Sequence, residues 1–167
     1  MEPLEIKLTQ TLKQIQPVDA KAMELARKRW DSIAKPLHSL GLLEDAITAI
    51  AGIQRTAQVT LSKKCVAAFC ADNGVVAQGV TQSGQEVTAI VTENFCSGQT
   101  SVCAMARATG ADIIPVDIGV ARDVHGKGLR IHKIAYGTAD ITEGPAMTRE
   151  QAADAILYGI ELVGELK

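Results

Sequence analysis

Apolar residues in the first third of the chain recur at helical spacing. One helix face is predicted by the three- and four-residue repeat of Met23, Ala26, Trp30 and Ile33. Asp19 precedes this repeat and is a good N-cap, so we expect a helix from Asp19 to about Ala34. A second helix is predicted from about Leu42 to Arg55. Because two short amphipathic helices cannot bury both apolar stripes alone, they should pack on each other, on the rest of the chain or on a second subunit.

The pattern changes after Gln58, where apolar runs of strand length begin. The unbroken run Cys65–Ala71 is typical of a parallel strand that is covered on both faces, and it stops at the turn signal Asp72-Asn73-Gly74. A second run, Ile113–Val120, contains Pro115, which would cost a ladder hydrogen bond and so places this strand near a sheet edge. The alternating segment Arg130–Ala135 is a candidate third strand.

Helix signals lie between and after these runs. Ser83–Glu86 has the form of a capping box, and it precedes a predicted helix face of Val87, Ile90, Val91 and Phe95. Ser97-Gly98 should interrupt this helix, and Gly110 should end its continuation. Thr148–Gln151 is a second capping box, followed by a predicted inner face of Ala152, Ala155, Ile156, Gly159, Ile160 and Val163. A helix between two strands implies parallel pairing with a right-handed connection, and therefore an α/β fold.

Composition excludes several classes of protein. The 167 residues carry 17 Lys and Arg against 19 Asp and Glu, a net charge of -2 with no electrostatic footprint for nucleic acid or an anionic membrane. Aromatic residues make up 3%, too few for a platform on which bases stack. The four cysteines form no C-x-x-C pair, so we expect reduced thiols, no metal site and a cytoplasmic protein without a signal or membrane-spanning segment.

The connection from Asp72 to Glu86 is the best local candidate for a binding site. In open α/β sheets, ligands bind beyond the carboxyl ends of the strands. Asp72 is expected there with its carboxylate in the crevice, and Asp117 holds the equivalent place after the second strand. Asp is also a common turn former, so the two residues are compatible with either role. The sequence contains neither a dinucleotide-binding glycine fingerprint nor a P-loop nor a nucleophile elbow.

Four segments in order resemble one enzyme family. They are Lys35–Glu44, Cys70–Ala89, Val116–Val120 and Gly144–Arg149, and together they are similar to the nicotinate-nucleotide:dimethylbenzimidazole phosphoribosyltransferase family. The resemblance implies a Rossmann-like parallel sheet, incomplete in this chain, with an N-terminal helical small domain. Residues 1–58 would form the helical small-domain and dimerisation segment, and residues 59–167 would form the N-terminal part of the Rossmann-like domain.

The resemblance also implies a reaction. The family moves phosphoribose from nicotinate mononucleotide to a nitrogen of a benzimidazole-type base, giving α-ribazole phosphate and nicotinate in cobalamin nucleotide-loop assembly. No cofactor or metal is expected, and the protein would act as a homodimer or as a heterodimer with a homologue. The chemistry requires a flat apolar slot for the base, a general base for its N–H group and an anchor for the phosphate.

The candidate substrate-binding residues are Asp72, from its place at the strand end, and Asn73, Ser83, Gln85, Glu86 and Val91, from the resemblance to the family. Val91 stands where a polar residue is frequent, Asn73 stands where His is usual, and His38 stands where Gly is usual. Asn73 can form hydrogen bonds but cannot shuttle a proton.

No catalytic residue is assigned, because the family's general-base glutamate is expected beyond Lys167; the isolated chain should therefore be inactive. Two alternatives remain open. The chain could be a non-catalytic partner subunit of a heteromeric transferase that activates a benzimidazole or phenolic base, or it could be an unrelated α/β ligand-binding module.

Overall fold

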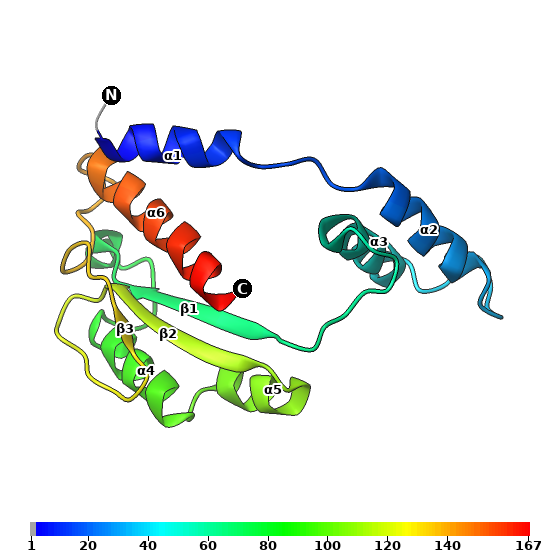
Figure 1. Ribbon diagram of the computed structural model, residues 1–167. Helices are drawn as coiled ribbons and strands as arrows, with labels where there is room; N and C mark the ends of the chain where they lie inside the picture. The colour runs from blue at the N-terminus through cyan, green and yellow to red at the C-terminus, as the bar shows by residue number, and fades with distance from the viewer. Residues whose placement is uncertain (1–2) are drawn as a thin grey trace. The chain divides into compact units, whose positions relative to one another are not determined.

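The computed structural model describes residues 3–167, which divide into two compact units. One unit combines Pro3–Lys13 with Lys63–Lys167, and the other is Gln14–Ser62. The elements, coloured in chain order in Figure 1, are α1 Pro3–Lys13, α2 Ala20–Asp31, α3 Leu42–Gln54, β1 Cys65–Ala71, the 3-10 helix η1 Gly74–Gln78, α4 Glu86–Ser97, α5 Ser101–Thr109, β2 Asp112–Gly119, β3 Arg130–Ile131 and α6 Arg149–Leu166.

The larger unit is built on a parallel sheet of order β1-β2-β3, which confirms the predicted α/β class. The expectation that the Pro115 strand lies near an edge is wrong, because β2 is the central strand. Proline is tolerated there because β3 pairs only with Val116 and Asp117 of β2. Pro115 therefore lies on a stretch of β2 that has β1 as its sole neighbour among the residues described.

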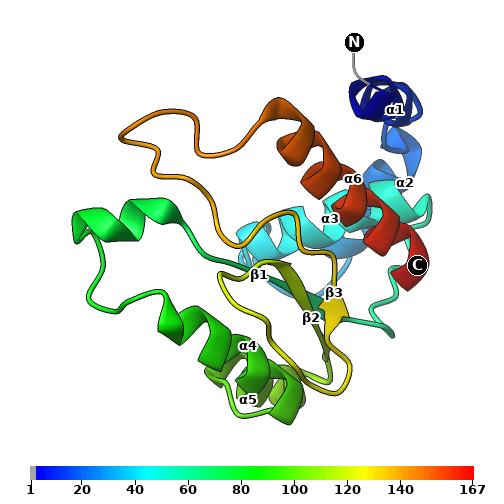
Figure 2. The same ribbon diagram turned by 90° about the vertical axis from the view of Figure 1, so that its left-hand side faces the viewer.

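Helices cover both faces of this sheet. In Figures 1 and 2, α4 and α5 lie on one face and α6 lies on the other. The α4 side holds a small core of Cys70, Ala89, Val120 and Val124, against which Phe95 and Leu129 pack. Gly98 and Gly110 end α4 and α5 in the left-handed conformation, as the sequence predicts.

The start of α4 differs from the expected capping box. Glu86 is the first helical residue, Gln85 holds the N-cap position, and no side chain caps the helix. Ser83 instead lies in the preceding loop, where its N–H group donates to the Thr81 hydroxyl at 3.4 Å. A capping box needs its glutamate at the third helical position, and Glu86 is two residues too early for that contact.

The buried faces of α4 and α6 are rotated from those predicted. Ala89 and Thr92 of α4 face the interior, whereas Val87, Ile90 and Val91 are 37%, 50% and 37% exposed. On α6 the buried residues are Ala153, Leu157 and Leu162, and Ile156, Ile160 and Val163 are exposed. Small side chains let α4 approach the sheet closely, so apolar periodicity alone does not identify the inner face.

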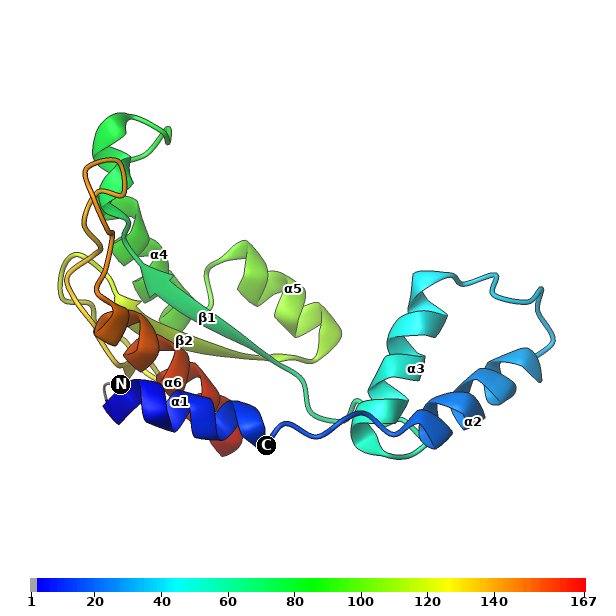
Figure 3. The same ribbon diagram turned by 90° about the horizontal axis from the view of Figure 1, so that it is seen from above.

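The sequence did not predict α1, which belongs with the sheet and not with the helical segment to which residues 1–58 were assigned. Figure 3 shows α1 alongside α6, and ion pairs join Lys7 to Glu161 and Arg149 to Glu5. The Lys7 ammonium lowers the pKa of Glu161. At the start of α6 the predicted capping box is confirmed. The Thr148 hydroxyl accepts the Gln151 N–H group at 3.1 Å, and Gln151 Oε1 accepts the Thr148 N–H group at 2.9 Å.

The smaller unit pairs α2 with α3. Asp19 caps α2 as predicted, and its carboxylate accepts the N–H groups of Lys21 and Ala22. In the first turn of α3, the buried Glu44 carboxylate lies 2.7 Å from Nζ of Lys35, which is in the connection between the helices, and this contact lowers the pKa of Glu44. His38 holds a φ of 53°, a left-handed conformation that glycine adopts more readily than histidine.

Within residues 3–167, no helix combines the length and the apolar character that crossing a bilayer requires.

Candidate functional site

The carboxyl ends of β1 and β2 are held by two buried aspartates. Asp117 is 1% exposed, and its Oδ1 accepts the N–H groups of Gly119 at 3.2 Å and Val120 at 2.9 Å. Its Oδ2 lies 2.8 Å from Lys133 Nζ, which also donates to the Val120 carbonyl at 2.6 Å. The Asp117–Lys133 pair therefore fixes both the loop that leaves β2 and the segment that follows β3.

Asp72 performs a similar role at the end of β1. It is 2% exposed, and its Oδ2 accepts the Ala121 N–H group at 2.7 Å. Its main-chain carbonyl accepts the N–H group of Thr138 at 3.0 Å. The carboxylate expected in the crevice is thus used to join the loop after β1 to the loop after β2, as a turn-forming aspartate would be.

A close backbone approach completes this arrangement. A Cβ atom on Gly74 would lie 2.6 Å from the main chain of Thr138 and Ala139, so only glycine fits here. Farther along η1, Gln78 Nε2 donates to Asp140 Oδ2 at 2.6 Å, and this bond lowers the pKa of Asp140. The two contacts hold η1 against the loop that runs from Thr138 to Pro145.

The turn after β1 opens onto a cavity of about 390 Å³, which we call the turn cavity. It brings together five of the six candidate residues, namely Asp72, Asn73, Ser83, Gln85 and Val91. Glu86 does not line it; its carboxylate folds back over Gly84. Gln85 Nε2 donates to the Asn73 carbonyl at 3.3 Å, which holds the loop across the cavity.

The walls of the turn cavity differ in polarity. Val87 and Val91 of α4 are its apolar residues on the helix, and Asn73, Ser83 and Gln85 supply polar atoms. Since Ser83 does not cap α4, its hydroxyl is not committed to the helix. A slot with one apolar wall and a few polar groups is suited to a planar heteroaromatic ring.

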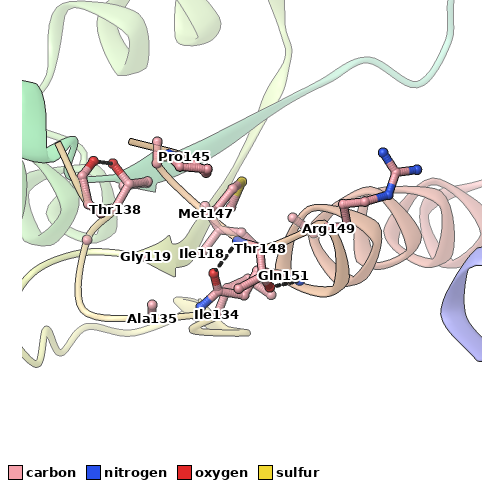
Figure 4. Close-up of a pocket in the computed structure, with 15 residues that line it drawn as sticks. Ile118, Gly119, Ile134, Ala135, Thr138, Pro145, Met147, Thr148, Arg149 and Gln151 are labelled. Carbon is pink, nitrogen blue, oxygen red and sulfur yellow. Dashed lines mark hydrogen bonds between the residues drawn. The ribbon is translucent and has the colours of Figure 1, made fainter. Parts of the chain in front are cut away.

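A second and larger cavity, of about 580 Å³, was missed by the sequence reasoning; we call it the strand-end cavity. Figure 4 shows its lining from the end of β2, the segment after β3 and the start of α6. Its apolar residues include Ile118, Ile134 and Met147, and polar atoms come from Thr138, Thr148 and Gln151. The resemblance of Gly144–Arg149 to the family was the one sequence signal that could have indicated it.

Ala71, the last residue of β1, lines both cavities. Among the described residues that line the strand-end cavity there is no Asp, Glu or His. Arg149 lies on its rim with its side chain 91% exposed and its Nε 2.9 Å from Glu5. No group of three His, Cys, Asp or Glu side chains within residues 3–167 is arranged to hold a metal ion.

Two of the cysteines, Cys70 and Cys96, are poor nucleophiles. All four are free, and burial raises the pKa values of the Cys70 and Cys96 thiols. A raised pKa keeps these thiols protonated and unreactive near neutral pH.

Helices on both faces of a parallel sheet, with cavities beyond the carboxyl ends of its strands, define a Rossmann-like α/β protein. A phosphoribosyltransferase family model (DBI_PRT) matches residues 15–167. The chain belongs to the nicotinate-nucleotide:dimethylbenzimidazole phosphoribosyltransferase family, as the resemblance predicted. This membership contradicts the alternative of an unrelated ligand-binding module.

Individual relatives agree with this assignment. The chain is 46% identical over 159 residues to a nicotinate-nucleotide–dimethylbenzimidazole phosphoribosyltransferase of Acetivibrio thermocellus, a match that covers 95% of this chain and 45% of the relative. It is 43% identical over 160 residues to the enzyme of that name from Alkaliphilus metalliredigens, covering 95% and 46%. The crystal structure of a protein of that name from Thermus thermophilus matches with a TM-score of 0.80 and 35% identity, over 89% of this chain and 45% of that one. The chain thus spans about half the length of these relatives.

Proposed function

We propose that this chain takes part in phosphoribosyl transfer from nicotinate mononucleotide to a benzimidazole-type base, and that the turn cavity holds the base. The observation that carries the proposal is the gathering of Asn73, Ser83, Gln85 and Val91 around one cavity at the end of β1. These are positions that the family resemblance names, and the relatives are named for dimethylbenzimidazole.

The bond changes of this reaction set the demands on the protein. A ring nitrogen of the base attacks C1′ of the ribose, the glycosidic bond to nicotinate breaks, and the second ring nitrogen gives up its proton. Val87 and Val91 would contact the ring face, and Ser83 and Gln85 would orient its nitrogens. The strand-end cavity shares Ala71 with the turn cavity, and its 580 Å³ is large enough for a mononucleotide.

The proton needs an acceptor that the described residues do not offer. Asp72 is the one carboxylate that lines the turn cavity, and its Oδ2 is held by the Ala121 N–H group. Asn73 cannot accept and release a proton at neutral pH. We therefore propose that the chain binds and orients the base but does not turn over by itself.

Calorimetry tests the assignment of the base. Titration of 5,6-dimethylbenzimidazole into the chain should show binding with a negative heat-capacity change, because apolar surface is buried. Val91→Asp places a charge on the apolar wall and should weaken binding about tenfold or more. Ile90→Asp is a matched control, since Ile90 is 50% exposed on the same helix and does not line the cavity. Equal affinities for the two variants would contradict the proposal.

A second candidate function is that of a non-catalytic partner subunit in a heteromeric transferase. The absence of Asp, Glu and His from the described lining of the strand-end cavity favours it. Mixing the chain with nicotinate mononucleotide and 5,6-dimethylbenzimidazole should yield no α-ribazole phosphate by chromatography. Robust turnover would exclude both this function and the proposed inactivity of the isolated chain.

A further inference from the structure

Two segments that line different cavities are joined to each other. The helix η1 contributes Val76 to the lining of the turn cavity, and the loop of residues 138–145 contributes Thr138 and Ala139 to the lining of the strand-end cavity. Figures 1 and 3 show η1 and this loop side by side. The Gly74 N–H group donates to the Thr138 hydroxyl at 3.2 Å and joins the first residue of η1 to the start of the loop. A wall of one cavity is therefore connected to a wall of the other.

Asp140 uses both of its carboxylate oxygens to shape this loop and to attach it to η1. Oδ1 accepts the Thr142 N–H group at 2.9 Å and the Thr142 hydroxyl at 2.8 Å, which forms a turn within the loop. Oδ2 accepts Gln78 Nε2 at 2.6 Å, at the last residue of η1. The Ala139 N–H group donates to the Ala146 carbonyl at 2.9 Å and closes the loop. One side chain thus fixes the conformation of the loop and its contact with η1.

The Gln78–Asp140 pair is separate from the cavities that it connects. Neither residue lines the turn cavity or the strand-end cavity, so neither would touch a ligand bound there. Gln78 is exposed, and one hydrogen bond at the surface is a small part of the stability of a domain. The pair is therefore suited to hold the two cavity walls in register, and not to bind a ligand directly.

We propose that Gln78 and Asp140 are positioning residues whose hydrogen bond couples the two cavities, so that a base in the turn cavity strengthens binding of the mononucleotide in the strand-end cavity. This inference rests on the proposed function, which assigns the two ligands to the two cavities. A base that contacts Val76 orders η1, and the Gln78–Asp140 bond extends that order to the loop of residues 138–145. The mononucleotide then binds beside a loop that is already ordered, so less conformational entropy is lost. By linkage, the mononucleotide strengthens binding of the base by the same factor.

Two measurements on the chain test the coupling. Nicotinate mononucleotide is titrated by calorimetry into the chain alone and into the chain saturated with 5,6-dimethylbenzimidazole, and its Kd should fall about fivefold when the base is present. Hydrogen exchange of the Ala139 amide should slow about fivefold when the base alone is added, because the loop that holds this amide opens less often. A Kd that the base leaves unchanged, or an Ala139 amide whose exchange the base leaves unchanged, would overturn the proposal.

Reversing the hydrogen bond separates positioning from direct contact between the two ligands. Gln78→Glu places a second carboxylate against Asp140 and should abolish the coupling, since the two groups repel each other and neither is a donor. Adding Asp140→Asn supplies a donor on the other side of the bond, and this double variant should regain the fivefold effect to within about twofold. Gln82→Glu is the matched control, because Gln82 is an exposed residue of the same connection that lines neither cavity.

The outcomes distinguish this proposal from the proposed function. Coupling that survives in Gln78→Glu, that is lost equally in Gln82→Glu, or that the double variant does not regain would overturn the role of the Gln78–Asp140 bond. A chain that binds both ligands with independent affinities would overturn the coupling and leave the proposed function standing. A chain that binds only one of the two ligands, or neither, would contradict the proposed function and the coupling with it.

Discussion

The Asp117–Lys133 pair offers the sharpest test of how the strand ends are held. Lys133→Met keeps the length of the apolar stem but removes the ammonium group, which lies 2.8 Å from Asp117 Oδ2. The Asp117 and Lys133 side chains are 1% and 13% exposed, so the variant leaves the buried Asp117 carboxylate without its counter-charge. The Val120 and Arg122 carbonyls also lose a donor.

Breaking a buried pair from one side costs about 3–5 kcal/mol. A loss of that size is a large share of the stability of a typical domain, about 5–15 kcal/mol. Urea unfolding followed by circular dichroism at 25 °C should show it as a lower midpoint with an unchanged slope. Lys28→Met removes the exposed Lys28–Glu24 pair of α2 and should leave the curve within error. A loss below about 1 kcal/mol for Lys133→Met would refute the view that this pair anchors the loops.

Two further outcomes test other parts of the molecule. Gly74→Ala forces a Cβ to 2.6 Å from the main chain of residues 138–140 and should destabilise the protein by about 1–3 kcal/mol in urea. Gly144→Ala, with no heavy atom within 4 Å of the added Cβ, is its control. Contact with Lys35 lowers the pKa of Glu44 from 4.5, so its contribution to folding is present above pH 4.5 and is lost as the pH falls through the lowered value. Acid unfolding of α2 and α3, followed by amide NMR signals, should therefore be less steep in Glu44→Gln than in the parent chain.

Local patterns in the sequence determined most elements. The apolar run Cys65–Ala71 forms β1, Asp19 caps α2, and Thr148 with Gln151 caps α6, as predicted. Each signal depends on hydrogen bonds or side-chain directions within a few residues, so these elements can be predicted without knowing the tertiary structure. Helix α1 was missed because its ion pairs reach Arg149 and Glu161, more than 140 positions away.

The candidate site could be identified only from the sequence and the tertiary structure together. The resemblance to a family identified Asn73, Ser83, Gln85 and Val91, and the fold places them around one cavity. By contrast, the Asp72 carboxylate accepts a hydrogen bond from the Ala121 N–H group, and Ala121 lies 49 positions later in the sequence. A strand-end aspartate has the same local sequence whether it faces a ligand or a loop. Its role here depends on the loop after β2, which the fold brings next to Asp72.

Tertiary structure alone decided the strand-end cavity and the inner faces of α4 and α6. The cavity is formed by segments of β2, the chain after β3 and α6, whose relative positions depend on sheet pairing and on the Asp117–Lys133 contact. The faces were set by close packing, which buries Ala89 and Thr92 on α4, and Ala153, Leu157 and Leu162 on α6. Sequence periodicity reports where apolar side chains lie around a helix, whereas burial depends on what shape the opposing surface presents.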